Sequence, residues 1–280
     1  MSPGSKFLLA GVMGWPVMHS RSPKLHNFWL QHYRLAGAYV PLEVKQDQLE
    51  QALRALPTLN FAGCNLTIPH KEAALRLVDS VDSVARRIGA VNTIVVGADG
   101  RLEGRNTDAF GFISSVCDAH PGWHAGDGPI VVLGAGGGAR AVLTALIESG
   151  AQEIWLANRN AGRAEALAEE FGPPLALCDW SKRHEALDEA AMLVNTTSLG
   201  MLGQPPLDIV LQALPSTAIV CDIVYVPLET PLLAAARRRG NPTVDGLGML
   251  LHQARPAFEA WSGILPEVTP ALRTMMEATL

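Results

Sequence analysis

The chain has 280 residues, which at about 150 residues per domain suggests two domains. Hydrophobic residues make up 48% of it and charged residues 18%, as in a soluble globular protein with a substantial core. The net charge of -5 argues against nucleic acid or an anionic membrane as a partner, because phosphate binding generally needs a concentrated basic surface, and no uncharged apolar stretch is long enough to span a bilayer.

Strands and helices alternate in the first part of the chain. An apolar run at residues 7–13 predicts a buried strand, and Ser22-Pro23 predicts the N-cap and first position of a helix that continues to Leu35. We expect further strands at residues 38–44 and 61–65, and helices at 47–56 and 69–78. Asp99-Gly100 separates two strand-like runs, 90–96 and 101–105, so the first half is expected to end in an antiparallel hairpin.

A second pattern follows a helix at residues 109–119 and a loop at 120–129 rich in Gly, Pro and His. The expected strands are 130–133, 153–157, 191–195 and 218–222, and the expected helices are 138–149 and 161–171. Alternating apolar strands and helices predict a parallel sheet covered on both faces. The last segment, 246–280, is helical in pattern, with an interruption near residues 263–266.

A glycine-rich turn joins the strand at 130–133 to the next helix, and its sequence fits G-x-G-x-x-A. The first glycine permits a tight turn, the second lets a pyrophosphate approach the backbone, and the small alanine lets helix and strand pack closely. The first helical N–H groups would then face the phosphates. The alternative is a merely structural turn. The predicted dinucleotide-binding residues here are Gly134, Gly136, Gly137, Gly138 and Ala139.

The turn after the next strand distinguishes the two nicotinamide cofactors. An NAD site usually has Asp or Glu there, whereas this chain has Asn158, Arg159 and, one helical turn later, Arg163. Two guanidinium groups suit the 2′-phosphate of NADP, so NADP is favoured. The alternative is that both arginines are ordinary surface residues.

Polar clusters in the first half follow predicted strands, where α/β sheets bind ligands. They lie at residues 19–23, 65–71, 89–93 and 106–108, and they supply hydroxyls, amides, one lysine and one carboxylate. These groups suit a small polyhydroxylated molecule. Together with residues 14–23, 158–163 and 245–253, these segments resemble, in order and spacing, motifs of the shikimate dehydrogenase family over nearly the whole chain.

The resemblance implies the roles of individual residues. Lys71 and Asp108 would form the catalytic pair, with Asp108 mainly orienting Lys71, because reduction of a ketone needs a proton donor at its oxygen. Ser20 and Ser22, helped by Tyr225, would bind the substrate carboxylate. The ring hydroxyls would be held by Thr67, Lys71, Asn92, Asp108 and Gln253, and the residues near the nicotinamide would be Gly246 and Met249.

Some of these residues also have structural interpretations. Ser22 could simply cap its helix, Asn92 could satisfy a buried turn, and Tyr225 could be a packing residue. Two positions depart from the family pattern: Ala109 replaces a frequent glycine, and His70 stands where an aromatic or apolar residue is common. Neither departure removes a functional group.

The sequence therefore predicts an α/β enzyme. Its substrate domain would have a mixed sheet and comprise residues 1–108 with helices at 245–280 packing back on it, and its Rossmann-type NADP domain would comprise residues 109–244. The active site is expected in the cleft between them. The expected reaction is the reversible NADPH-dependent reduction of 3-dehydroshikimate to shikimate, in the biosynthesis of chorismate and aromatic amino acids. The alternatives are a broader quinate/shikimate dehydrogenase and a noncatalytic regulatory homologue that binds the ligand or NADPH.

The remaining expectations concern partners and location. Cys64, Cys117, Cys178 and Cys221 form no C-x-x-C pair, which favours buried thiols in a reducing compartment over a disulfide or metal site. Only a short apolar run follows Lys6, so no secretory signal is expected and the location would be cytoplasmic. We expect no metal, nucleic-acid or membrane partner, and a monomer or homodimer.

Overall fold

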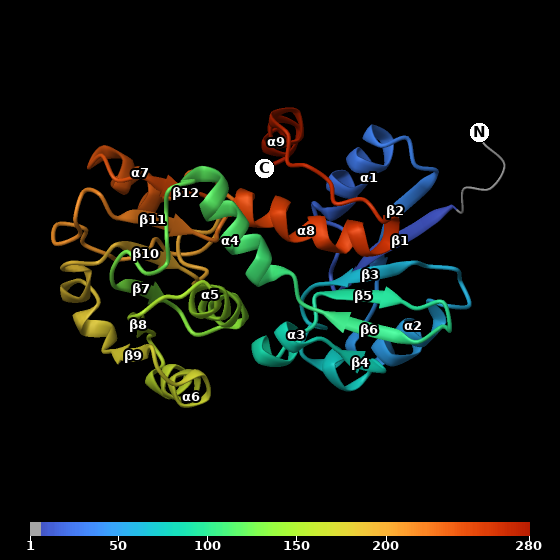
Figure 1. The fold of residues 1–280 in the computed structure, drawn as a ribbon, viewed down its shortest axis with the longest axis horizontal. Coiled ribbons are helices and arrows are strands. Elements are labelled where there is room, and N and C mark those ends of the chain that lie inside the picture. The colour runs from blue at the N-terminus through green and yellow to red at the C-terminus, as the bar shows by residue number, and fades with distance from the viewer. Residues whose placement is uncertain (1–6) are drawn as a thin grey trace. The chain divides into compact units, whose positions relative to one another are not determined.

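A computed structural model describes residues 7–280; Lys6, used above for the signal-sequence prediction, lies outside the described residues. The chain divides into two compact units. The first unit comprises the described residues up to Thr107 together with Gln253–Thr279. The second unit comprises Asp108–His252 and the terminal Leu280. Figure 1 gives the labels of their helices and strands.

The first unit contains a six-stranded mixed sheet in the order β2-β1-β3-β5-β6-β4. Its strands are β1 (Leu8–Gly14), β2 (Gly37–Glu43), β3 (Gly63–Leu66), β4 (Ser80–Val81), β5 (Thr93–Val96) and β6 (Leu102–Arg105). Strand β1 runs parallel to β2 and β3, whereas β5 runs antiparallel to β3 and β6, with β4 parallel to β6. The predicted hairpin and the mixed sheet are confirmed.

The helices of the first unit come from both ends of the chain. They are α1 (Ser22–His32), α2 (Leu49–Ala55), α3 (Ser83–Ile88), α9 (Pro270–Glu277) and the second part of α8 (Gly246–Ser262), with short 3-10 helices at Gln46–Gln48 and Ala73–Arg76. Helices α1 and α9 are in contact, and Trp29 Nε1 of α1 donates to the Glu267 carbonyl at 3.1 Å. The buried rings of Trp29 and Phe258 lie 5.4 Å apart, which fixes the end of α8 in this core.

The second unit contains a fully parallel sheet in the order β12-β11-β10-β7-β8-β9. Its strands are β7 (Ile130–Leu133), β8 (Ile154–Ala157), β9 (Leu175–Cys178), β10 (Met192–Asn195), β11 (Ile219–Asp222) and β12 (Thr243–Val244). The apolar runs of β7 and β10 are completely buried, as expected for strands covered on both faces. This order is that of a Rossmann-type doubly wound sheet, as predicted.

The helices of the second unit come from one continuous part of the chain. They are α4 (Asp108–Ala119), α5 (Gly137–Glu148), α6 (Ala161–Phe171), α7 (Pro231–Arg238) and the first part of α8. The Asn160 and Thr230 side chains accept from the first turns of α6 and α7, and Pro231 occupies a position where no N–H is needed. Helices α4 and α5 pack side by side (Figure 1).

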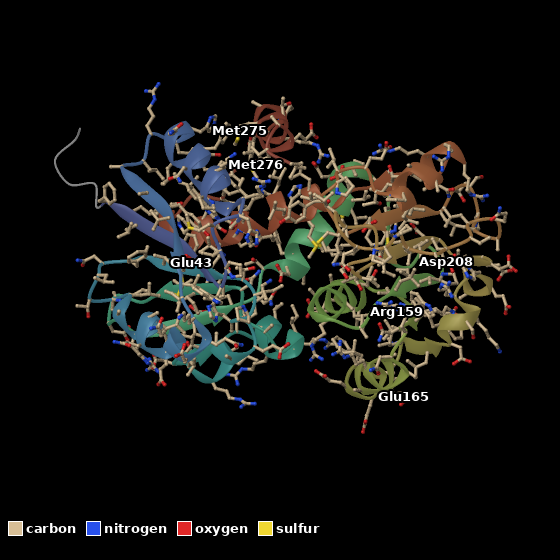
Figure 2. The ribbon with its side chains drawn as sticks, turned by 180° about the vertical axis from the view of Figure 1, so that it is seen from behind. Glu43, Arg159, Glu165, Asp208, Met275 and Met276 are labelled. Carbon is tan, nitrogen blue, oxygen red and sulfur yellow. The ribbon has the colours of Figure 1, made fainter. Side chains whose placement is uncertain are left out.

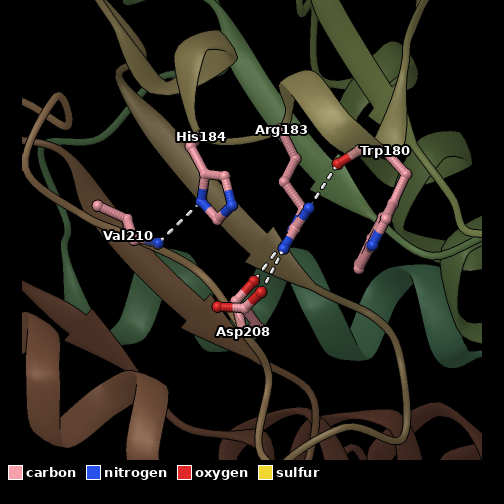
Figure 3. Close-up of polar contacts among 5 residues, drawn as sticks. All are labelled: Trp180, Arg183, His184, Asp208 and Val210. Atoms are coloured by element: carbon pink, nitrogen blue, oxygen red, sulfur yellow. Dashed lines mark hydrogen bonds and ion pairs between the residues drawn. The ribbon is translucent and has the colours of Figure 1, made fainter.

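The buried Arg183 lies in the segment after β9 and binds Asp208, which lies in the long connection between β10 and β11 (Figure 3). The Arg183 guanidinium donates to the Asp208 carboxylate at 2.8 Å, to the Asp208 carbonyl at 3.0 Å and to the Trp180 carbonyl at 2.7 Å. It also lies 4.6 Å from the centroid of the Trp180 ring, and Val210 N–H donates to His184 Nδ1 at 3.0 Å. These contacts stabilise a stretch with little regular structure.

Two predictions about the first unit are wrong. Residues 69–78 do not form a helix, because the Lys71 carbonyl accepts from Val91 N–H at 2.8 Å instead of from its own segment, and only the 3-10 turn at Ala73–Arg76 remains. Ser22 is not an N-cap either. Arg21 occupies that position without a side-chain cap, so Ser22 is the first helical residue.

Candidate active site

The predicted substrate-binding residues of the first unit lie at the ends of its strands or near them. Ser20 precedes α1 and Ser22 begins it, both half-buried, while Thr67 and Lys71 follow β3 and are also half-buried. Asn92 directly precedes β5 and is only 2% exposed. The Ser22 N–H donates to Ser20 Oγ at 3.3 Å, so the Ser20 hydroxyl proton points elsewhere.

A chain of buried side-chain hydrogen bonds connects several of these positions, and we refer to Tyr39, Asn65, Thr93, Asn92 and Thr107 as the buried relay. Tyr39 Oη donates to Asn65 Oδ1 at 2.7 Å, and Asn65 Nδ2 donates to Thr93 Oγ1 at 3.0 Å. Thr93 Oγ1 donates to Asn92 Oδ1 at 2.9 Å, and Asn92 Nδ2 donates to Thr107 Oγ1 at 3.0 Å. All five side chains are buried, so each lost bond would leave an expensive unpaired group.

Backbone groups fix the direction of this relay. The Thr107 N–H donates to Asn92 Oδ1 at 3.0 Å, and a backbone N–H can only donate, so the Asn92 amide has one orientation. In the same way the Asn92 carbonyl accepts from Asn65 Nδ2 at 3.2 Å, which turns Asn65 Oδ1 toward Tyr39. The two amides are therefore held in place by hydrogen bonds within the protein.

Both ends of the relay reach predicted substrate-binding residues. At one end the Thr107 hydroxyl lies 3.5 Å from Gln253 Oε1 on α8. At the other end, burial raises the pKa of Tyr39 well above its usual value, and a hydrogen bond with the Ser22 side chain opposes this shift. The relay thus brings Ser22, Asn92 and Gln253 into one connected polar system within the first unit.

Lys71 lies on a turn that is fixed by backbone bonds on both sides. Its carbonyl accepts from Val91 N–H, as described above, and the preceding Thr67 N–H donates to the Met13 carbonyl at 2.9 Å. The buried His70 side chain lies 2.7 Å from the Val44 carbonyl through Nε2, which must therefore carry the proton. Burial lowers the pKa of His70, so this ring adds no second positive charge beside Lys71.

Asp108 and Tyr225 belong to the second unit. Asp108 is the half-buried first residue of α4 and directly follows Thr107 of the relay. Tyr225 is half-buried on the segment after β11.

The glycine-rich turn after β7 has the shape that a dinucleotide needs. Gly134 has φ +108°, and a Cβ there would lie 2.6 Å from Thr196 Oγ1, so glycine is required. A Cβ on Gly136 or Gly137 would meet nothing within 4 Å, so open space lies over the start of α5. Gly136 is the N-cap and provides no side-chain bond, which leaves the first-turn N–H groups to a ligand, while Gly138 and the buried Ala139 follow in the helix.

The turn after β8 presents two exposed arginines at the start of α6; Figure 2 labels Arg159 together with Glu165 of that helix. Asn158 Nδ2 donates to the Asn160 carbonyl at 2.8 Å, and Asn160 Oδ1 accepts from Arg163 N–H at 3.1 Å, so the turn itself is ordered. Among residues 7–280, neither the Arg159 nor the Arg163 guanidinium has a hydrogen-bond or ion-pair partner. Together with the open glycine turn, these groups fit a phosphorylated dinucleotide such as NADP.

Helix α8 begins against the backbone of the segment after β11. Gly246 is buried, and any Cβ there would overlap the Ile223 carbonyl, so glycine is required for the close approach. Asp245 Oδ1 accepts from the Leu247 N–H at 3.1 Å and caps the helix start. Met249 lies half-buried one turn further.

A buried carboxylate, Asp222, lies at the end of β11. The sequence predicts only its place at the end of that strand. Asp222 is 2% exposed and accepts from Asn195 Nδ2 at 3.0 Å, Val224 N–H at 3.0 Å and Thr230 Oγ1 at 2.7 Å. Burial raises the pKa of Asp222 to about 6, although these three hydrogen bonds oppose the shift. A polar residue at the carboxyl end of an otherwise apolar strand is the sequence signal for it.

This raised pKa predicts how stability changes with pH. Because the folded state binds the Asp222 proton more tightly than the unfolded state, the contribution of Asp222 to stability is complete below about pH 4 and is lost as pH rises to about 6. The loss amounts to about 3 kcal/mol in the free energy of unfolding. Asp222→Asn lacks this titration, so we expect its stability relative to the unaltered chain to rise across that window in urea unfolding. A constant difference would contradict the prediction.

The described part of the chain, residues 7–280, has neither a metal-binding cluster nor a membrane-spanning helix. Within residues 7–280, no three His, Cys, Asp or Glu side chains are grouped so that they could hold a metal ion. Helices in that same range are all too short or too polar to cross a bilayer. The four cysteines are free thiols; Cys64 and Cys221 are buried, and Cys117 is exposed.

Three family models match the chain. They are the shikimate dehydrogenase substrate binding domain at residues 12–94, the shikimate / quinate 5-dehydrogenase model at residues 123–202 and the shikimate 5'-dehydrogenase C-terminal domain at residues 246–276. The matches follow one another in the order of the predicted segments.

Whole-chain relatives agree with these matches. The chain is 58% identical to the shikimate dehydrogenase (NADP(+)) of Paramagnetospirillum magneticum, over 97% of this chain and 98% of that protein. The structure of shikimate 5-dehydrogenase from Thermus thermophilus in complex with NADP(H) and shikimate aligns with a TM-score of 0.87 and 39% identity, over 98% of this chain and 100% of that one. Quinate dehydrogenase from Corynebacterium glutamicum in complex with NAD aligns with a TM-score of 0.88 and 32% identity, over 98% of each chain.

Proposed function

This chain belongs to the shikimate dehydrogenase family, and we propose that it catalyses the reversible NADP-dependent oxidation of shikimate to 3-dehydroshikimate. In the biosynthetic direction it would reduce the ketone, on the route to chorismate and the aromatic amino acids. The observation that carries the proposal is the buried relay, because it connects groups suited to a carboxylate (Ser22) with groups suited to ring hydroxyls (Asn92 and Gln253).

The substrate-binding set follows from this arrangement. Ser20, Ser22 and Tyr225 would bind the carboxylate, and Thr67, Asn92 and Gln253 would bind the ring hydroxyls together with the catalytic pair. Preformed donors and acceptors favour a rigid polyhydroxylated ring, because little reorganisation is needed when it binds.

Lys71 would carry the proton in this reaction. When bound, NADP supplies the hydride chemistry. During ketone reduction the Lys71 ammonium would donate its proton to the oxygen of the former carbonyl as negative charge develops there, and during shikimate oxidation the Lys71 amine would take the hydroxyl proton back. Asp108 would orient Lys71 and bind substrate. The short turn that holds Lys71 keeps the start of its side chain in one place.

The cofactor would be held by the second unit. The pyrophosphate would lie over Gly136 and Gly137 at the start of α5, where the first-turn N–H groups point outward. Arg159 and Arg163 would clamp the 2′-phosphate, with Asn158 shaping the turn. Gly246 and Met249 at the start of α8 would border the nicotinamide.

The free cysteines agree with a reducing compartment such as the cytoplasm, which we propose as the location. We propose a monomer or homodimer as the working form.

Turnover with four substrate pairs tests the proposal directly. The purified chain is mixed with shikimate or quinate and with NADP or NAD, and formation of the reduced cofactor is followed by its absorbance. Rapid turnover only with shikimate and NADP is expected. Comparable turnover of quinate would favour the broader quinate/shikimate dehydrogenase, and folded protein that binds NADPH without turning over any pair would favour a noncatalytic regulatory homologue.

A further inference from the structure

The Asp222 carboxylate holds both ends of the segment that carries Tyr225. Near the start of the segment, Asp222 Oδ1 accepts from Val224 N–H at 3.0 Å, one residue before Tyr225. At its far end, Asp222 Oδ2 accepts from Thr230 Oγ1 at 2.7 Å, and Thr230 in turn caps α7 by accepting from Leu233 N–H. One buried side chain therefore closes residues 223–230 into a loop.

The same carboxylate is tied to the strand beside it. Asn195 Nδ2 donates to Asp222 Oδ1 at 3.0 Å and to the Leu199 carbonyl at 3.1 Å, while Asn195 Oδ1 accepts from both the N–H and the hydroxyl of Thr197. In each of these three hydrogen bonds, Asp222 is the acceptor and the other group is the donor. Oδ1 must be an acceptor, because Asn195 Nδ2 and Val224 N–H can only donate, whereas the Thr230 hydroxyl that faces Oδ2 can donate or accept.

Helix α8 depends on the position of this segment as well. Its first residue, Gly246, packs directly on the Ile223 carbonyl without space for a side chain. A shift of the loop at Ile223 would therefore move the start of α8, where the proposed nicotinamide contacts lie.

We propose that Asp222 is a positioning residue, whose carboxylate sets the loop 223–230 so that Tyr225 can bind the substrate carboxylate. This inference rests on the proposed function, because it concerns the role of Tyr225 there. Asp222 itself is buried beneath the loop and does not touch substrate; it acts through Val224 and Thr230.

Fluorine NMR tests the structural part without any ligand. The chain has three tyrosines, Tyr33, Tyr39 and Tyr225, so fluorotyrosine labelling gives three resonances that Tyr→Phe variants assign. In Asp222→Asn, an amide N–H replaces the acceptor that faces Thr230, so the Thr230 hydroxyl must turn from donor to acceptor while it still accepts from Leu233 N–H, and the far end of the loop is perturbed. We expect the Tyr225 resonance to shift or broaden while the Tyr33 and Tyr39 resonances of the first unit stay in place.

A matched control removes a different aspartate of the same unit. Asp208→Ala deletes the ion pair with Arg183 (Figure 3) and removes none of the three bonds to Asp222. Its Tyr225 resonance should match that of the unaltered chain. A Tyr225 resonance that is unchanged in Asp222→Asn, or that changes equally in Asp208→Ala, would overturn the proposal.

Steady-state kinetics test the functional part. We expect Asp222→Asn to raise KM for shikimate about 3- to 10-fold, which corresponds to the net free energy of one hydrogen bond. The changes in kcat and in KM for NADP should be smaller. In a Tyr225→Phe background the same substitution should change KM less than about twofold, because the contact it positions is already gone. An equal rise in both backgrounds would overturn the positioning role.

Two results distinguish a failure of the positioning role of Asp222 from a failure of the proposed role of Tyr225. If Tyr225→Phe alone leaves KM for shikimate unchanged, the proposed role of Tyr225 fails and the positioning role fails with it. If Tyr225→Phe raises KM and Asp222→Asn does not, only the inference about Asp222 fails. Thermal unfolding of Asp222→Asn shows the temperature at which the variant stays folded, and the KM comparison is made below it, so a KM effect cannot be attributed to general unfolding.

Discussion

Replacing Lys71 by alanine is expected to lower kcat by about 10²- to 10⁴-fold while KM for shikimate changes only a few fold. The reason is that the Lys71 ammonium is proposed to act on the oxygen only as charge develops there, in the transition state. An interaction made only in the transition state affects kcat, whereas one made equally in the ground state affects KM. Stopped-flow and steady-state measurements with shikimate and NADP check both values.

Lys24→Ala is the matched control for this substitution. Lys24 is an exposed lysine on α1 of the same unit, so its removal changes the net charge equally without touching the turn after β3. Its kinetics should equal those of the unaltered chain. If Lys71→Ala instead raised KM and left kcat unchanged, Lys71 would be a binding residue, and the proton would have to come from another group.

The elements with strong local signals are predictable from sequence. Strand β7 and helix α5 are an example, because an apolar run leads into a glycine turn that is followed by a helical pattern. The helix expected at residues 69–78 fails for a nonlocal reason: the Lys71 carbonyl bonds to Val91, twenty residues along the chain, and this bond competes with the helical one. Strands β4 and β12 are only two residues long and carry no pattern of their own.

The candidate site was predictable as a set of residue types at strand ends, but not as a connected structure. Asn65 and Thr93 lie in recognised polar segments, yet Asn65 bonds to Thr93, 28 residues away, and to Tyr39, 26 residues away, which no periodicity reports. Asp222 shows the same limit. Its place at the end of β11 is predictable, whereas the three donors that converge on it come from β10, the following loop and the cap of α7.

The second large effect is expected at the cofactor turn. Arg159→Ala should lower kcat/KM for NADP by about 10- to 100-fold, the value of one charge-assisted hydrogen bond, and leave kcat/KM for NAD within about threefold. The two cofactors differ only by the 2′-phosphate, so a group that reads this phosphate affects one cofactor and not the other. Kinetics with both cofactors at saturating shikimate measure the ratio.

The arrangement of the turn makes this ratio interpretable. Asn158 and Asn160 order the turn through bonds that do not involve the Arg159 guanidinium, so the substitution should leave its backbone intact. Arg238→Ala, an exposed arginine on α7 of the same unit, changes the net charge equally and should leave the ratio of NADP to NAD use unchanged. An equal loss with NADP and NAD in Arg159→Ala would mean that Arg159 supports the turn and does not read the phosphate. If Arg159→Ala lowers kcat/KM for NADP alone, adding Arg163→Ala should lower it further relative to kcat/KM for NAD only if both guanidinium groups bind the same 2′-phosphate.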